Sequence, residues 1–351
     1  MNDKTIWQQH NMSRRKLFKV VGASAGMFAL ESAFPSFPVS AARSSFIKGA
    51  DISWLPQMEA HGYKFYNANG VQKDLFTILK GYGISAIRLR TWVNPSNDPA
   101  NGHCSQAETI AMAVRCSKAK FAVAISFHFG DTWNDEGHQN TPTAWINMSY
   151  NQMLDTMSHY VYNFMTEIKA KKVIPRWVAI GNEINEGICL PTGSLAQHPD
   201  QMTGLLNAAH KMVKQVSPST QVLIHLASPQ KISAIQNFFD AYKAHGGHWD
   251  ITAFSSYLSG QDIPTALSAM TNFQSRYNKP VMQLEFGGPV ASPDETQASL
   301  KTYITGLKHF GALGLFYWEP EGYWPFTDYG MGAWDAKTMR PTSALNGFFN
   351  A

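Results

Sequence analysis

Cysteine is scarce in this sequence, which has three among its 351 residues: Cys104, Cys116 and Cys189. No Cys-x-x-Cys pair and no cluster of histidine with cysteine is present, so a zinc site of the common kinds is not expected. In an oxidising compartment these cysteines permit one disulfide, and Cys104 and Cys116 are the nearer pair in the sequence. The sequence leaves open whether that bond forms.

Long apolar runs and a dinucleotide-binding signature are also missing. No segment approaches the roughly 20 apolar residues that cross a bilayer as a helix. No Gly-x-Gly-x-x-Gly follows the first β-rich run, which argues against an open, doubly wound sheet. Charge is sparse as well, since charged residues make up 15% of the chain and the formal net charge is +4.

The first 41 residues resemble a twin-arginine export signal. Ser13–Lys19 reads Ser-Arg-Arg-Lys-Leu-Phe-Lys, and a short apolar stretch and the small residues Val39–Ala41 follow it. This segment contributes three of the four net positive charges, so residues 42–351 are nearly neutral and offer no electrostatic case for nucleic acid or an anionic membrane. We therefore expect a periplasmic or secreted protein after removal of 1–41, and a monomer without a protein partner.

From residue 46 onward, short β-rich runs alternate with segments of helical periodicity. The longest such helix is expected around Met153–Ile168, where apolar residues recur three and four apart. Eight β-rich runs over about 300 residues predict a single (β/α)8 barrel domain over 42–351. The expected strands lie near 47–53, 84–90, 121–128, 176–183, 221–226, 251–257, 280–286 and 312–318.

The stretch Val178–Glu186 indicates where chemistry takes place. Val178–Ile180 is typical of a strand buried on both faces, and Asn182 and Glu183 follow where the strand ends. In a (β/α)8 barrel, the carboxyl ends of the strands carry the catalytic groups. A lone Asn-Glu pair is more often an ordinary surface feature, so the interpretation depends on the other strands.

The other expected strands also end in polar or aromatic side chains. Convergent groups of this kind in one concave site are the usual mark of an active site. These residues are Asp51, Arg88, Arg90, Trp92, His128, Asp131, Trp133, His225, Tyr257, Glu285 and Trp318.

This set of residues fits retaining glycoside hydrolysis, which needs two carboxyl groups about 5–5.5 Å apart. We expect Glu183 to be the acid and Glu285 the second carboxylate, with an arginine beside Glu285 and a hydrogen bond from Tyr257. Partial burial and the charge of Glu285 should raise the pKa of Glu183 towards roughly 6. Asn182 is placed to hold a sugar hydroxyl.

Aromatic residues supply candidate stacking surfaces for sugar rings. Trp318 is expected to form an apolar floor. Further candidates, of which at least half are expected only to pack in the core, are Trp92, Trp133, Trp145, Tyr323 and Trp324.

Several motifs resemble the endo-β-1,4-galactanases of glycoside hydrolase family 53. They are Gly49–Ser53 (Gly-Ala-Asp-Ile-Ser), Arg88–Pro95 (Arg-Leu-Arg-Thr-Trp-Val-Asn-Pro), Phe127–Trp133 (Phe-His-Phe-Gly-Asp-Thr-Trp), Gly181–Asn185 (Gly-Asn-Glu-Ile-Asn) and Phe316–Pro320 (Phe-Tyr-Trp-Glu-Pro). The resemblance covers nearly all of 47–349.

The resemblance implies Glu183 as acid/base and Glu285 as nucleophile, and β-1,4-galactan of type I arabinogalactan as substrate. It also implies Arg88, Asn182, Tyr257 and Trp318 in the active site, with Asp51, Arg90, His128, Asp131 and His225 nearby. No cofactor is implied. Some bacterial relatives bind calcium, but no matching ligand set is found in this sequence.

Two alternatives stay open. The chain can be another retaining glycosidase of the same clan that acts on a different β-linked glycan, such as a mannan or a glucan. A non-catalytic sugar-binding protein on a barrel scaffold is the other, although it normally lacks at least one of the two glutamates, and both are present here.

Overall fold

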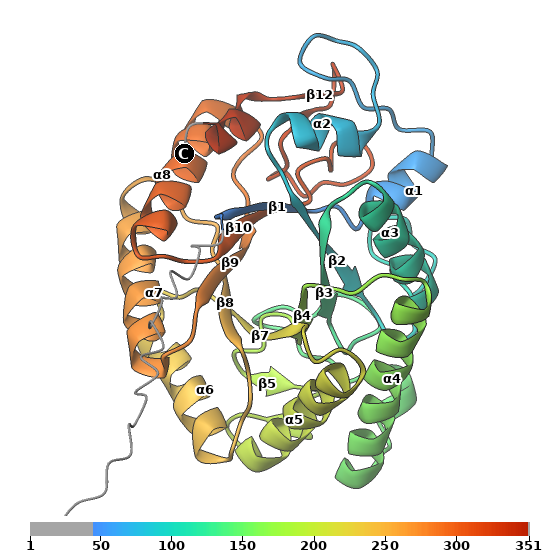
Figure 1. Ribbon diagram of the computed structural model, residues 1–351, viewed down its shortest axis with the longest axis vertical. Helices are drawn as coiled ribbons and strands as arrows, with labels where there is room; N and C mark the ends of the chain where they lie inside the picture. The colour runs from blue at the N-terminus through green and yellow to red at the C-terminus, as the bar shows by residue number, and fades with distance from the viewer. Residues whose placement is uncertain (1–44, 350–351) are drawn as a thin grey trace, which may run out of the picture. The chain divides into compact units, whose positions relative to one another are not determined.

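A computed structural model describes residues 45–349, which form a closed barrel of parallel strands (Figure 1). The strand order around the barrel is β1-β10-β9-β8-β7-β4-β3-β2. Each barrel strand therefore pairs with the barrel strands that precede and follow it in the sequence, and β1 closes the ring against β10. The barrel strands are β1 (Ile47–Asp51), β2 (Ala86–Thr91), β3 (Ala122–Phe127), β4 (Trp177–Ile180), β7 (Gln221–Ala227), β8 (Ile251–Ser255), β9 (Val281–Phe286) and β10 (Gly314–Trp318).

Helices connect successive strands and surround the barrel (Figure 1). Local sequence signals start two of them, because Ser105 and Glu108 form a capping box at α3, and Ser149 and Gln152 form another at α4. The helices are α1 (Leu55–Ala60), α2 (Leu75–Gly81), α3 (Gln106–Lys118), α4 (Tyr150–Ala170), α5 (Pro199–Val216), α6 (Ile232–Ala244), α7 (Ile263–Tyr277) and α8 (Pro293–His309).

Short elements decorate the connecting loops. Two small hairpins pair β5 (Gly187–Ile188) with β6 (Gly193–Ser194), and β11 (Trp334–Asp335) with β12 (Arg340–Pro341). The 3₁₀ helices are η1 (Thr143–Trp145), η2 (Gly260–Asp262) and η3 (Ser343–Phe348).

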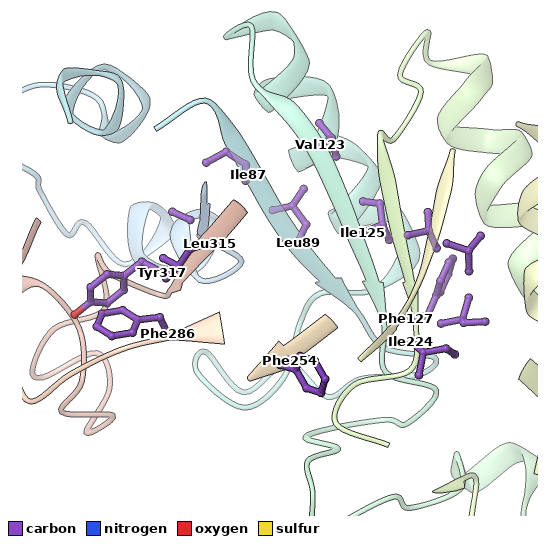
Figure 2. Packing of buried hydrophobic residues seen from close by; sticks show 14 of the residues in the cluster. Ile87, Leu89, Val123, Ile125, Phe127, Ile224, Phe254, Phe286, Leu315 and Tyr317 are labelled. Carbon is purple, nitrogen blue, oxygen red and sulfur yellow. The ribbon is translucent and has the colours of Figure 1, made fainter. Parts of the chain in front are cut away.

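Strand alternation divides the core into an outer and an inner part. Ile87 and Leu89 of β2 and Val123 of β3 belong to the outer core, between the strands and the helices (Figure 2). Ala86 and Ala124, which point the other way, belong to the inner core inside the barrel. The rings of Trp177 and Phe316 pack edge-to-face in that inner core, with their centroids 6.2 Å apart, and Trp177 is also among the fully buried side chains.

The inner face of β2 becomes charged towards its carboxyl end. Ala86 is followed on the same face by Arg88 and Arg90, both with 1% of their surface exposed. The lower barrel is therefore filled by apolar side chains, and the upper barrel by charged ones that need partners.

The predicted barrel is confirmed, and all eight expected strands exist with ends shifted by a few residues. The predicted long helix is α4, with 21 residues. Cys104, Cys116 and Cys189 are buried and form no disulfide. Within residues 45–349, no helix is long and apolar enough to span a membrane. The export signal expected at 1–41 lies outside the described residues.

Candidate active site

Glu183 and Glu285 face each other at the carboxyl ends of the strands. Glu183 lies three residues beyond the end of β4, and Glu285 is the penultimate residue of β9, directly before Phe286. One carboxylate oxygen of each lies within 4.8 Å of the other and of a ring nitrogen of His225. These two oxygens are therefore as close as the roughly 5–5.5 Å of retaining glycosidases demands, and well short of the roughly 6.5 Å or more of inverting ones.

Both carboxylate oxygens of Glu285 accept strong hydrogen bonds. Oε1 pairs with Nη1 of Arg88 at 2.7 Å, and Oε2 accepts from the hydroxyl of Tyr257 at 2.7 Å. The arginine and tyrosine contacts predicted for Glu285 are both present. These donors hold the carboxylate in one orientation.

Arg88 is fixed in turn by three further acceptors. Nη1 donates to Oδ2 of Asp51 at 2.9 Å, while Nη2 donates to Oδ1 of Asn182 at 2.7 Å and to Oγ of Ser126 at 3.1 Å. The amide of Asn182 also donates to the carbonyl of Asn134 at 2.8 Å. Arg88 therefore links the strand-four residue Asn182 to the Glu285 carboxylate.

Glu183 has a markedly different environment. Burial, and then the negative charge of Glu285, raise the pKa of Glu183 to about 8. The direction and both causes are as expected, but the value is higher than the roughly 6 that we predicted, and burial of the carboxyl group is the larger cause. Its side chain accepts hydrogen bonds from the Ser255 hydroxyl and the backbone N–H of Glu136, and these partly oppose the shift.

The backbone brings Glu183 to this position through an unusual turn. Gly181 has φ +117° and Glu183 has φ +50°, both in regions that L-residues with a Cβ rarely adopt. A Cβ on Gly181 would meet Cγ2 of Ile184 at 2.6 Å, so glycine is required there. Strained positions of this kind cluster at functional sites.

Ser255 connects Glu183 to a buried histidine. Its Oγ lies 2.7 Å from Nε2 of His225, and the same hydroxyl reaches Glu183. Burial and the charge of Arg88 lower the pKa of His225 well below its ordinary value, so the ring is neutral. Because Ser255 donates its single hydroxyl proton to Glu183, Nε2 of the neutral ring is the donor to Oγ of Ser255.

A cavity of about 300 Å³ opens between the two glutamates. Trp318 forms part of its wall, and its ring packs edge-on against Tyr329 at 4.5 Å, Trp54 at 5.2 Å and Trp133 at 5.7 Å between centroids. Polar and aromatic groups together suit a sugar. The lining residues are His128, Trp133, Asn134, Asp135, Asn182, Glu183, Tyr257, Glu285, Trp318, Tyr329 and Met331.

Comparison with known proteins gives a family. Residues 47–306 match the model of glycosyl hydrolase family 53. The chain belongs to this family. A probable arabinogalactan endo-β-1,4-galactanase A from Neosartorya fischeri is 31% identical, over 80% of this chain and 85% of the relative. An arabinogalactan endo-β-1,4-galactanase A from Emericella nidulans is 30% identical, over 78% and 84%.

Solved structures agree with this family. The GH53 catalytic domain of Ignisphaera aggregans superposes with a TM-score of 0.80 at 28% identity, covering 90% of this chain and 97% of that domain. The chain is therefore a glycoside hydrolase with the fold of family 53.

Several residues expected to touch the substrate of this family 53 enzyme do not line its cavity. Asp51, Arg90, Trp92 and His225 are absent from the lining and none has more than 1% of its surface exposed, so their contact with a sugar stays a prediction. Arg88 is equally buried and acts on Glu285 instead. Their polar groups face one another or the glutamates.

Asp131, which was expected near the active site, holds two loops together. It is absent from the cavity lining, and its carboxylate accepts from the backbone N–H groups of Asn94 at 3.0 Å and Thr143 at 2.8 Å. Asp131 thus ties together two loops above the family 53 barrel. Of the additional aromatic candidates, Trp145 and Tyr323 are buried in the core, and Trp324 is exposed.

Five residues of the site were missed, namely Asn134, Asp135, Ser255, Tyr329 and Met331. Ser255 lies near the end of a predicted strand, which is a weak signal because serine is common there. Tyr329 and Met331 line the cavity from an irregular segment after β10 that has no periodicity. Nothing in their neighbourhood of the sequence predicts that they reach the glutamates.

Within residues 45–349, one group of His, Cys, Asp and Glu side chains is close enough to share a metal ion, namely Glu183, His225 and Glu285. Its donors are already engaged, since Arg88 pairs with Glu285 and Ser255 contacts His225. The guanidinium charge of Arg88 also disfavours a cation at this point. The donor set therefore fits the two carboxyl groups of a family 53 hydrolase better than a metal centre.

Proposed function

We propose that this enzyme is an endo-hydrolase of β-1,4-galactosidic bonds in galactan and type I arabinogalactan, the side chains of pectin. The observation that carries the proposal is the facing pair Glu183 and Glu285 in a family 53 barrel, with their oxygens within 4.8 Å. The family 53 relatives named as arabinogalactan endo-β-1,4-galactanases support the choice of glycan.

The proposed mechanism is a double displacement with retention. Glu285 attacks the anomeric carbon while Glu183 gives its proton to the departing glycosidic oxygen, so the C–O bond breaks and a glycosyl–Glu285 ester forms. A water then attacks the anomeric carbon. Glu183 takes the proton of that water, and the ester bond to Glu285 breaks to restore the free carboxylate.

The different surroundings of the two carboxyl groups support these separate roles. The raised pKa of Glu183, about 8, keeps it protonated near neutral pH, as an acid requires. Esterification removes the charge of Glu285, which is one of the two causes of that raised pKa. The pKa of Glu183 then falls, and the same group serves as a base in the second step.

The deciding experiment compares substrates and follows products with time. Purified enzyme is incubated with linear galactan, mannan, cellulose and xylan, with Glu285→Gln as the inactive control. We expect galactan alone to be cut, with galacto-oligosaccharides of mixed length first and the β-anomer as the initial product by NMR. Galactose as the sole early product would indicate an exo enzyme. If mannan or cellulose is digested and galactan is not, the enzyme is a retaining glycosidase with a different substrate.

We also propose that residues 1–41 direct twin-arginine export and are removed, leaving 42–351 as the catalytic domain. Support comes from Ser13–Lys19, the short apolar stretch after it, and Val39–Ala41. A polysaccharide that cannot enter a cell requires an enzyme outside the cytoplasm, which agrees with this destination.

A further inference from the structure

Two buried glutamates follow Trp318 and have no part in the proposed mechanism. Glu319 and Glu321 both have 0% of their surface exposed, in the segment that leaves β10. A buried carboxylate is costly unless charge partners and hydrogen-bond donors surround it. The two residues differ sharply in what surrounds them.

Glu319 has the partners of a charged group. Its Oε1 forms an ion pair with Nη1 of Arg90, and its Oε2 accepts from the backbone N–H of Trp54 at 3.2 Å. Arg90 is also near Asp51, with 4.0 Å between Nη1 and Oδ1. Burial raises the pKa of Glu319, but Arg90 and the hydrogen bonds to the carboxylate oppose that rise, so Glu319 is the more readily ionised member of the pair.

Glu321 has no such partners. Among residues 45–349, no donor of another residue makes a regular hydrogen bond to Oε1 or Oε2 of Glu321. Its carboxyl group instead shares a hydrogen bond with the carboxyl group of Glu319. Two ionised carboxylates are both acceptors, so this hydrogen bond exists only if one of them holds a proton.

We propose that Glu321 is a carboxylic acid that keeps its proton at neutral pH, donates a hydrogen bond to Glu319 and so positions Arg90 behind the tryptophans that line the cavity. Glu321 is a positioning residue, since it touches neither the cavity nor the two central glutamates. The proposal deepens the proposed function, on which its kinetic readout rests.

Charge balance in the upper barrel supports this protonation state. The ion pairs run from Glu319 through Arg90, Asp51 and Arg88 to Glu285, with Glu321 at the far end. Four carboxyl groups in this chain face two guanidinium groups, so full ionisation would bury two uncompensated negative charges. One proton on Glu321 halves that excess.

Two titratable neighbours of these ion pairs are neutral and add no charge to them. The Cys104 thiol faces Arg90, and burial raises the pKa of Cys104 to about 12. The Tyr329 phenol lies near Glu319, and burial raises the pKa of Tyr329 well above its ordinary value. Burial, and then the charge of Glu319, raise the pKa of Glu321 well above the value of a free glutamate.

Arg90 transmits this arrangement to the substrate floor. Its guanidinium lies 4.6 Å from the ring centroid of Trp133 and 5.4 Å from that of Trp54. Both rings pack against Trp318, which lines the cavity. If Glu319 turned away from Arg90, the guanidinium would no longer be held against Trp54 and Trp133, and these rings would no longer hold Trp318 in place.

Two substitutions test whether Glu321 acts as a neutral hydrogen-bond donor or as an ionised carboxylate. Glu321→Gln keeps the size, the neutrality and a donor, whereas Glu321→Leu keeps only size and neutrality. We expect Glu321→Gln to keep kcat within about twofold of wild type with an unchanged pH profile, and Glu321→Leu to lower kcat about tenfold, as for loss of one hydrogen bond to a charged group. Glu295→Gln, at an exposed glutamate of α8, is the control for the same chemical change.

Infrared spectroscopy tests the protonation state without substrate. Glu183→Gln removes the other protonated glutamate, so the carbonyl stretch of a buried carboxylic acid that remains at neutral pH should come from Glu321. We expect this band in Glu183→Gln and its loss in Glu183→Gln/Glu321→Gln. This outcome is independent of whether galactan is the substrate.

Two results would overturn the proposal. One is a carboxylic acid band that persists in the double variant, because the proton would then lie elsewhere. The other is a Glu321→Gln variant as impaired as Glu321→Leu, because wild-type Glu321 would then be an ionised group. If Glu321→Leu does not fold, the spectrum and the Glu321→Gln kinetics still decide.

Discussion

The hydroxyl of Tyr257 donates a hydrogen bond of 2.7 Å to Oε2 of Glu285, on the opposite side of the carboxylate from Arg88. The tyrosine comes from the loop after β8 and the glutamate from β9, so the pairing of these two neighbouring strands brings the two side chains together. It fixes the direction in which Glu285 presents its oxygen to a sugar.

Tyr257→Phe should therefore lower kcat while leaving the fold intact. A hydrogen bond to a charged group is worth roughly 1.5–3 kcal/mol, which is about a 10- to 150-fold change in rate. Tyr303→Phe is the matched control, since the Tyr303 hydroxyl lies 2.6 Å from Oγ of Ser256, away from the cavity. Equal loss of kcat in both variants would contradict a specific role for Tyr257. Steady-state kinetics and thermal melts of both variants measure this.

The raised pKa of Glu183 predicts the alkaline limb of activity. Its acid form is needed for the first step, so kcat/KM should fall as pH rises through about 8. Measurement of kcat/KM against pH on a soluble galacto-oligosaccharide checks this. A limb near pH 6 would mean that water reaches Glu183 more freely than its burial suggests.

The same group predicts how stability depends on pH. The pKa of Glu183 rises from 4.5 to about 8 on folding, so the folded state holds a proton that the unfolded state releases in this interval. Stability is thus highest below pH 4.5 for this contribution and is lost as pH rises towards 8. The melting temperature of Glu183→Gln, which cannot ionise, should fall less than that of wild type across this window. Parallel curves would contradict the linkage.

The two central glutamates should differ in kind when each is replaced by alanine. Glu183→Ala should still form a covalent intermediate with an activated aryl galactoside, because a good leaving group needs no acid, and azide should yield a β-linked product. Glu285→Ala should form no intermediate, and azide should yield the α-linked product. NMR of the azide adducts measures this, and reversed stereochemistry would exchange the two roles.

Trp318 and Trp177 provide a comparison between a cavity tryptophan and a core tryptophan. Trp177 is 1% exposed inside the lower barrel, so Trp177→Ala should cost about 3–5 kcal/mol of stability. Trp318 lines the cavity, so Trp318→Ala should lower kcat/KM more than it lowers the melting temperature. A melting temperature of Trp318→Ala as low as that of Trp177→Ala, with activity per folded molecule retained, would assign Trp318 to packing.

The chemistry at the strand ends could be predicted from the sequence because strand periodicity is a local property. Glu183 and Glu285 follow buried apolar runs, and Arg88 shares a face with Arg90 by simple alternation. Once a closed barrel is assumed, these ends must converge. The contacts of Glu285 with Arg88 and Tyr257 follow from that convergence.

The depth of each side chain could not be predicted in this way. Trp92 and Trp133 both follow predicted strands, yet Trp92 is 0% exposed and Trp133 lines the cavity. That difference is set by loops whose path has no periodic signal. Glu321 shows the same limit, because a charged residue in a loop is ordinarily exposed, and its burial depends on the whole segment after β10.

The division of the barrel interior into an apolar lower part and a charged upper part has a consequence for engineering. Asp51, Arg88, Arg90 and Glu319 belong to ion pairs that reach Glu285, so a replacement chosen at these positions for heat resistance would also disturb turnover. The outer core, where Ile87, Leu89 and Val123 meet the helices, has no such connection (Figure 2). Durable variants for processing plant material should be sought in that outer layer, where tighter packing leaves the reaction untouched.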